Sequence, residues 1–245
     1  MDPFVARHRF DRWFWIAFVA MAWFAVAMGF KHQIGLRFSG QADYPAPPAL
    51  VIHVFAFFGW LTVLTLQVAL VETRRVAWHR LLGLSALVLA PVMAWSAIAA
   101  EAYSQRFYVD IYPDGYTFFP VPVASVTCFS LSVIAALLLR RRPAWHKRLI
   151  YLATSVVLVA AYYRWWGEAF YAAMPPGVLT EWVANYAGVV VLLLVGAGYD
   201  LATRGSLHPA FRLGIPLFLA AQLAAVTLGA SDWWAGVAPG LLGLP

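Results

Sequence analysis

Histidines in two similar turns are the side chains of this sequence best suited to hold a metal centre. His79 follows the run Arg74-Arg75-Val76-Ala77-Trp78, and His146 follows Arg141-Arg142-Pro143-Ala144-Trp145, 67 residues later. Imidazole is a usual axial ligand of haem iron, so two histidines at one membrane depth could bind a b-type haem. A second interpretation places both rings at the membrane interface, hydrogen-bonded to helix ends or lipid phosphates.

Another polar group falls in a short turn towards the C-terminus. Asp200 and Arg204 are spaced i, i+4, which pairs side chains on a helix, and His208 follows them. Together with His79 and His146 they could form a cluster that holds a divalent cation or an anionic ligand, as in an intramembrane metal-dependent hydrolase. The closely spaced HxxxH pairs typical of zinc sites do not occur in the sequence.

A third set of polar residues forms a stripe at seven-residue spacing within one apolar stretch. The stripe consists of His53, Trp60 and Gln67. Residues so spaced stay on nearly one helix face, and polar side chains in hydrocarbon point into a helix bundle. Arg164 could join them, with Glu101 or Glu168 as counter-charge. The stripe then either hydrogen-bonds neighbouring helices or lines a pocket for a quinone or a lipid-like molecule.

Motifs of other chemistries are missing from the sequence. It contains no phosphate-binding glycine loop, no HExxH, no CxxC and no GxSxG. Its two lysines, Lys31 and Lys147, both lie outside the apolar stretches, so a retinal Schiff base within the last helix is excluded. The single cysteine excludes a disulfide scaffold.

The composition of the sequence predicts the kind of structure that positions these residues. Hydrophobic residues make up 63% of the 245 residues, charged residues make up 11%, and the mean hydropathy is +0.74. This predicts an all-α polytopic membrane helix bundle that forms one transmembrane domain over residues 1–245. Seven apolar stretches are long enough to cross a bilayer. They are residues 13–30, 50–71, 81–100, 118–139, 149–166, 182–199 and 213–231.

Basic residues predict the orientation. With the N-terminus in the cytoplasm, thirteen of the seventeen arginines and lysines fall on the cytoplasmic side, and the other four are Lys31, Arg37, Arg106 and Arg164. Such a bias predicts an N-in, C-out topology. The net charge of +6 is then explained by orientation and by anionic lipid, so no nucleic-acid partner is expected.

The first apolar stretch has a second interpretation. A basic leader before an apolar run and the small residues Ala25-Val26-Ala27 resemble a cleaved secretory signal. Bulky residues such as Trp13, Trp15 and Trp23 favour a retained helix instead. Cleavage would leave six helices in the same orientation.

The two histidine turns also indicate an internal repeat. Arg-Arg, Ala, Trp, His and a following cation recur in step between predicted helices 2 and 3 and between predicted helices 4 and 5. A duplicated helical hairpin would explain this pattern, since internal repeats are common in membrane folds. Similar selection on two cytoplasmic turns would explain it as well.

Three motifs resemble those of a group of bacterial multi-pass membrane proteins that has no established activity. They are His53…Trp60…Gln67, the HR-x-LG turn at His79-Arg80-Leu81-Leu82-Gly83, and Asp200…Arg204-Gly205…His208-Pro209-Ala210. The resemblance covers roughly residues 50–235 and implies a helical fold in the bacterial cytoplasmic (inner) membrane. Phe55 departs from the pattern, because relatives often carry a second histidine there, which weakens a metal site near His53.

These patterns favour a membrane protein that binds a small amphiphilic or anionic ligand, or that serves as an accessory membrane component. The candidate ligand-binding residues are His53, Trp60, Gln67, Arg164, Asp200, Arg204 and His208. One alternative is a b-type membrane cytochrome that transfers electrons through His79 and His146. The other is a metal-dependent hydrolase within the membrane. The expected partners are the lipid bilayer and, if the stripe lines a pocket, a quinone or a lipid-like small molecule.

Overall fold

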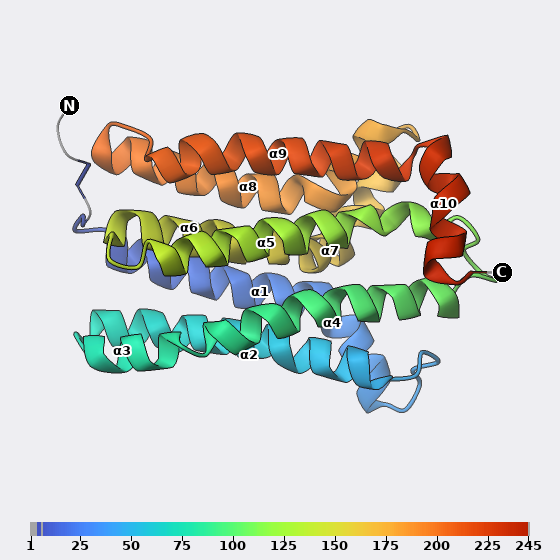
Figure 1. The fold of residues 1–245 in the computed structure, drawn as a ribbon, viewed down its shortest axis with the longest axis horizontal. Coiled ribbons are helices and arrows are strands. Elements are labelled where there is room, and N and C mark those ends of the chain that lie inside the picture. The colour runs from blue at the N-terminus through green and yellow to red at the C-terminus, as the bar shows by residue number, and fades with distance from the viewer. Residues whose placement is uncertain (1–3, 6, 245) are drawn as a thin grey trace.

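The computed structural model describes residues 4, 5 and 7–244, and the described residues form helices without any strand (Figure 1). Ten are α-helices and one is a short 3₁₀ helix. They are α1 (Asp11–Phe38), α2 (Pro48–Glu72), α3 (Val76–Gly83), α4 (Ala86–Phe107), η1 (Gly115–Phe118), α5 (Pro120–Leu138), α6 (Pro143–Val157), α7 (Val159–Ala173), α8 (Val178–Arg204), α9 (Pro209–Gly229) and α10 (Asp232–Leu242).

The helices are those of a multi-pass membrane protein. Six segments of the described chain are long and apolar enough to cross a bilayer, and the bent pair α6–α7 is a seventh if it counts as one span. The predicted helix bundle is confirmed, and each span coincides with one of the seven apolar stretches. Most helices extend beyond those stretches because charged residues end the apolar run before they end the helix: α1 starts at Asp11 and runs past Lys31.

The fifth span is broken near its middle, which the sequence does not indicate. Helices α6 and α7 meet at Leu158 with a bend of 46°. The Leu158 N–H bonds the Ser155 carbonyl three residues back, at 3.3 Å, so the backbone tightens there into a 3₁₀-like turn. Thr154 and Ser155 are fully buried beside the break. The bundle therefore has a polar, irregular segment in its interior.

The arginine-rich segments meet at one end of the bundle, here called the basic end (Figure 1). It comprises the start of α1, the α2–α3 turn, the α5–α6 turn and the α8–α9 turn. The basic side chains there are Arg7, Arg9, Arg12, Arg74, Arg75, Arg80, Arg140, Arg141, Arg142, Lys147, Arg148, Arg204 and Arg212. This arrangement is what a positive-inside topology requires, because all the basic turns lie on one side.

Helix α10 lies across the opposite end, here called the α10 end (Figure 1). It was not predicted, since the last apolar stretch ends at Ser231, where the Ser231 hydroxyl accepts the Trp234 N–H and caps a new helix. The Trp234 indole N–H donates to the Tyr116 carbonyl at 2.9 Å, and Arg106 donates to the Leu242 carbonyl at 3.1 Å. These contacts hold α10 on η1 and α4.

Close helix packing depends on small residues at a few crossings. A methyl group on Gly29 of α1 would overlap the Ala161 backbone of α7, and one on Gly188 of α8 would overlap the Tyr162 ring. Glycine thus lets these backbones approach, as in other membrane bundles. The α2 and α4 helices pack on one another, and α1 and α5 join them to the rest of the bundle.

The topology gives the first prediction. With Cys128 replaced by Ser, a membrane-impermeant maleimide should label a cysteine at Asp110 in intact cells, because the bias of the basic residues predicts that the α10 end faces outward. A cysteine at Arg141 should react only after the membrane is permeabilised. Both native side chains are exposed, so accessibility reports sidedness alone. Labelling of position 141 in intact cells would reverse the orientation.

Candidate functional site

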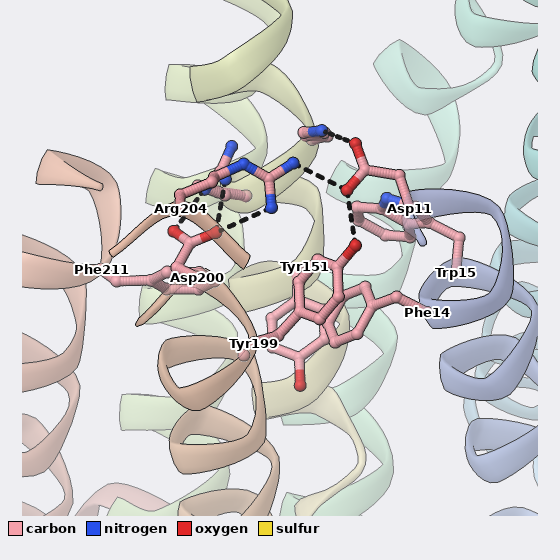
Figure 2. A pocket seen from close by; sticks show the side chains of 11 residues that line it. Asp11, Phe14, Trp15, Tyr151, Tyr199, Asp200, Arg204 and Phe211 are labelled. Carbon is pink, nitrogen blue, oxygen red and sulfur yellow. Dashed lines mark hydrogen bonds and ion pairs between the residues drawn. The ribbon is translucent and has the colours of Figure 1, made fainter. Parts of the chain in front are cut away.

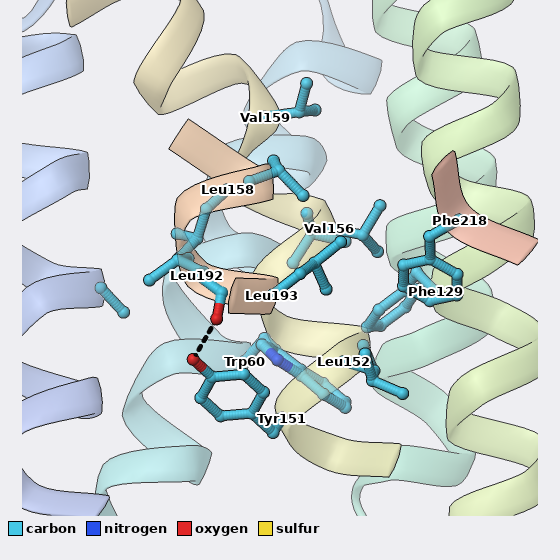
Figure 3. Close-up of a cluster of buried hydrophobic side chains, with 14 of the residues drawn as sticks. Trp60, Phe129, Tyr151, Leu152, Val156, Leu158, Val159, Leu192, Leu193 and Phe218 are labelled. Atoms are coloured by element: carbon cyan, nitrogen blue, oxygen red, sulfur yellow. Dashed lines mark hydrogen bonds between the residues drawn. The ribbon is translucent and has the colours of Figure 1, made fainter. Parts of the chain in front are cut away.

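The polar stripe on α2 points into the bundle. The Trp60 side chain is buried, and its indole N–H donates to the Thr154 hydroxyl of α6 at 3.1 Å, with its ring against Phe129 of α5 (Figure 3). The amide nitrogen of Gln67 lies beside Gly83. Trp60 is therefore satisfied by the protein and fastens the middle of α2 to the broken span.

The two ends of the stripe are not satisfied in this way. The His53 Nδ1 and Gln67 Oε1 atoms are buried and have no hydrogen-bond partner among the described residues. The Ser155 hydroxyl, one residue after Thr154, shares this condition. A buried polar atom without a partner costs about 1–3 kcal/mol, so such atoms are uncommon where nothing binds.

At the α10 end, His53 lies in a cluster with Arg164 of α7 and Glu101 of α4. The Arg164 guanidinium interacts electrostatically with both residues. It lies over the Phe30 ring at 5.0 Å and donates to the Ala160 carbonyl at 3.2 Å. Of the two predicted counter-charges, Glu101 is the one within electrostatic range.

A group of aromatic residues lies beside this cluster. Tyr44, in the segment between α1 and α2, stacks on Tyr108 at 5.4 Å and meets Tyr103 and Phe107 edge-on. Tyr44 also interacts electrostatically with Glu101. Residues from the loop and from the end of α4 thus close the α10 end above the cluster.

At the basic end, Asp200 and Arg148 form a buried ion pair. Arg148 Nε lies 2.7 Å from Asp200 Oδ2, and Arg148 Nη2 lies 2.5 Å from Asp200 Oδ1, which is a two-pronged contact. The two side chains are 4% and 1% exposed. The predicted Asp200–Arg204 contact is present at 3.7 Å, longer than the pair with Arg148. Arg148 was not among the predicted site residues.

A second carboxylate, Asp11, extends this pair into a network (Figure 2). Its Oδ1 accepts hydrogen bonds from Arg204 and from the Tyr199 hydroxyl, both at 2.7 Å, and its Oδ2 lies 2.7 Å from Lys147 Nζ. Arg204 therefore lies between Asp11 and Asp200 and joins α1 to α8. Sequence spacing gave no indication of this, because Asp11 is 188 residues from Tyr199.

The network is closed rather than open to a ligand. The space enclosed among its side chains is about 10 Å³, enough for roughly one water molecule. The N-terminal segment covers it: the Phe4 ring lies 4.5 Å from the Arg148 guanidinium, and the Val5 carbonyl accepts from Arg204 at 2.9 Å. The predicted ligand residues Asp200 and Arg204 thus make their contacts within the protein. No cavity of ligand size lies between them.

His208 is the N-cap residue of α9 and is also part of this network. Its Nδ1 accepts the Ala210 N–H at 3.1 Å, and its backbone N–H donates to Asp200 Oδ2 at 3.3 Å. Gly205 ends α8 in the left-handed region, at φ 65°, and Pro209 begins α9, which is how a tight helix–helix turn is built. His208 therefore holds this turn against Asp200.

The pKa of His208 is lowered from its ordinary value of 6.5 to about 4, chiefly because the ring is buried. The nearby cations Arg148, Lys147 and Arg204 contribute to this lowering, and Asp200 opposes it. The cap geometry agrees with this direction, since a ring nitrogen that accepts a hydrogen bond must be unprotonated.

His79 and His146 form a separate pair instead of joining Asp200. Their ring centres are 6.3 Å apart, and the ring planes are nearly perpendicular. Among the described residues, no three histidine, cysteine, aspartate or glutamate side chains are grouped so that they could hold a metal ion. The metal-dependent hydrolase therefore finds no support in the described part of the chain.

No protein-family model, curated protein or solved structure matches this chain. The kinship indicated by the three sequence motifs stays a prediction. Function has to follow from the geometry and chemistry of these sites.

Breaking the buried ion pair should destabilise the protein. We expect Arg148→Met to lower the free energy of unfolding by about 3–5 kcal/mol, because it leaves Asp200 charged and buried without its main partner. Arg141→Met, an identical change on an exposed arginine of the preceding turn, should have little effect. Denaturant unfolding in detergent measures both, and the double variant Arg148→Met/Asp200→Leu should recover part of the loss. Equal stability of the two single variants would contradict this role.

Acid should weaken the same end of the bundle through His208. Its pKa is lower in the folded chain than in the unfolded chain, so the unfolded state binds more protons between about pH 6.5 and pH 4, and stability falls as the pH falls through that window. His208→Asn, which keeps an N-cap acceptor without titrating, should flatten this part of the pH profile. Thermal unfolding at stepped pH measures it. An unchanged slope in the variant would assign the acid sensitivity elsewhere.

Proposed function

We propose that this multi-pass membrane protein binds a small amphiphile with a singly charged anionic head, held by Arg164 and His53 at the α10 end. We infer a location in the bacterial cytoplasmic membrane from the motif resemblance, and an outward-facing α10 end from the bias of the basic residues. Binding and release of such a molecule need no catalytic group, in keeping with the absence of a catalytic motif in the sequence.

The observation that carries the proposal is an arginine without an ion pair. Among the described residues, no aspartate or glutamate forms a salt bridge with Arg164, whereas Arg148 has one and Arg204 has two. A charged side chain within a span is costly unless an anion pairs with it, and charged residues within spans are functional by default. An anionic head would supply the missing partner.

His53 supplies a second contact for the same head. Its Nδ1 is buried without a partner, and its ring is held against Phe57 with 4.2 Å between ring centres. The neighbouring Glu101 accepts a hydrogen bond from Gln105 at 2.6 Å and acts electrostatically on Arg164. Its carboxylate repels further negative charge, so the site suits a singly charged head such as a carboxylate better than a doubly charged phosphate.

The surroundings of Arg164 suit an apolar tail. The Arg164 side chain is exposed at the bundle surface, and other side chains lie around it. Phe30 lies under its guanidinium, and Phe24 of the same helix meets Trp165 edge-on at 5.3 Å. An amphiphile could therefore enter from the lipid, with its tail along the aromatic residues of α1 and α7.

Removing the charge of Arg164 should abolish head-group selectivity. Quenching of tryptophan fluorescence by ω-bromoundecanoate, with the protein in zwitterionic nanodiscs, measures affinity, and ω-bromoundecanol is the uncharged control. We expect Arg164→Gln to weaken binding of the acid by about ten- to a hundredfold, the worth of one charge-assisted hydrogen bond, and to leave the alcohol unchanged.

Arg106→Gln is the matched variant, because Arg106 lies at the same end and is bonded to α10 instead. It should bind the acid like the parent chain. An anion site would be contradicted if the parent chain bound the acid and the alcohol with equal affinity. It would also be contradicted if the parent chain and Arg164→Gln bound the acid equally well. Quenching by decylubiquinone that is lost in His53→Ala but kept in Arg164→Gln would replace the anion by a quinone.

A further inference from the structure

Helix α10 lies across the spans instead of along them (Figure 1). It follows α9, which ends at Gly229, after a link of two residues, and the second of these, Ser231, caps its first turn. Two residues of chain reach at most about 7 Å, so α10 must begin close to the depth at which α9 ends its crossing of the bilayer. The link therefore holds α10 at the edge of the membrane.

The inner face of α10 packs beside α4 rather than beyond its end. The buried residues of this face form an apolar cluster with the N-terminal side of α5; they are Trp234, Ala238 and Leu242, with Phe119. Ile98 and Ala102 of α4 pack against the cluster. At 1.5 Å per residue they lie about 8–14 Å before the end of α4 at Phe107. Helix α10 is thus at the depth where the apolar stretch 81–100 ends.

The outer face of α10 is apolar as well. Trp233, Val237 and Leu241 follow one side of the helix at four-residue spacing, and they are 65%, 40% and 65% exposed. Asp232, in the first turn, is the one charged residue of the helix. A helix that faces water carries polar residues on its outer side, whereas a helix that is apolar all round is surrounded by protein or lipid. Since the described residues cover only the inner face, lipid is the surrounding that suits the outer one.

We propose that α10 is an interfacial helix, and that Trp233, Val237 and Leu241 insert between the head groups and the acyl chains of the leaflet at the α10 end. Tryptophan is enriched at this depth because its ring is apolar and its N–H is polar. The helix contains no lysine or arginine, so its insertion rests on apolar area and not on attraction to anionic lipid. The placement is independent of amphiphile binding at Arg164.

Spin-label accessibility tests this placement. In the Cys128→Ser background, a nitroxide is attached to Val237→Cys or Leu241→Cys, and the protein is reconstituted in phosphatidylcholine nanodiscs. Oxygen concentrates in lipid, and a neutral nickel chelate concentrates in water. We expect both labels to be relaxed more strongly by oxygen, as should a label on Leu223→Cys at the exposed face of α9. A label on Asp110→Cys, in the exposed loop after α4, should be relaxed more strongly by nickel.

Fluorescence quenching gives a second measurement, of depth. Bimane attached to Val237→Cys should be quenched more strongly by phosphatidylcholine brominated near the carbonyl end of its chains than by the same lipid brominated near the methyl end, because an interfacial helix lies shallow in the leaflet. Replacing part of the lipid by phosphatidylglycerol should leave both signals unchanged, since the helix has no basic residue to attract an anionic head group.

Three outcomes would overturn the proposal. Stronger relaxation by nickel than by oxygen at positions 237 and 241 would place the outer face of α10 in water. Weak relaxation by both reagents would show that protein covers this face, and dipolar coupling between labels would identify that protein as a second copy of the chain. Stronger quenching by the deeply brominated lipid would place α10 within the hydrocarbon. None of these outcomes bears on fatty-acid quenching by the parent chain and Arg164→Gln.

Discussion

The ion pair between Arg148 and Asp200 is the interaction on which the basic end depends. Two opposite charges removed from water are tolerable only when each is paired and hydrogen-bonded, and this pair meets that condition through its two-pronged contact and the His208 N–H. Asp200 lies on α8, His208 caps α9 and Arg148 lies on α6. A single carboxylate therefore sets the relative position of three helices. Asp11 connects α1 to the same group through its contact with Arg204.

Lipid as solvent explains why polar side chains gather in so few places. Hydrocarbon offers no hydrogen bonds, so a polar group within a span must find its partner in the protein. Trp60 and Thr154 do so for one another, and the Tyr151 hydroxyl bonds the Leu192 carbonyl at 2.6 Å (Figure 3). The stripe on α2 and the break between α6 and α7 face each other for this reason.

The sequence predicted the spans well because bilayer thickness sets their length. An uncharged run of about 20 residues is therefore recognisable as a span. It also placed His79 and His146 at one depth, because the repeat of their turns fixes the position of each ring relative to the membrane. It could not reveal Asp11 as a partner of Arg204, since that contact joins residues 193 positions apart and charges at span ends ordinarily face water. Nor could it reveal the bend at Leu158, where neither proline nor glycine occurs.

The degree of hydrogen-bond satisfaction differs between the polar groups at the two ends of this bundle. Around Asp200 every carboxylate oxygen has a donor and the enclosed space holds about one water, so an added ligand would have to displace an existing partner. Around His53 the reverse holds, because its buried Nδ1 has no partner within the described chain. Stability alone does not account for such atoms, since apolar residues of similar size would avoid the cost of burying them. Asp200, Arg204 and His208, which carry the most conspicuous motif of the sequence, therefore serve the fold, whereas the ligand site that we propose includes the unpaired Nδ1 of His53.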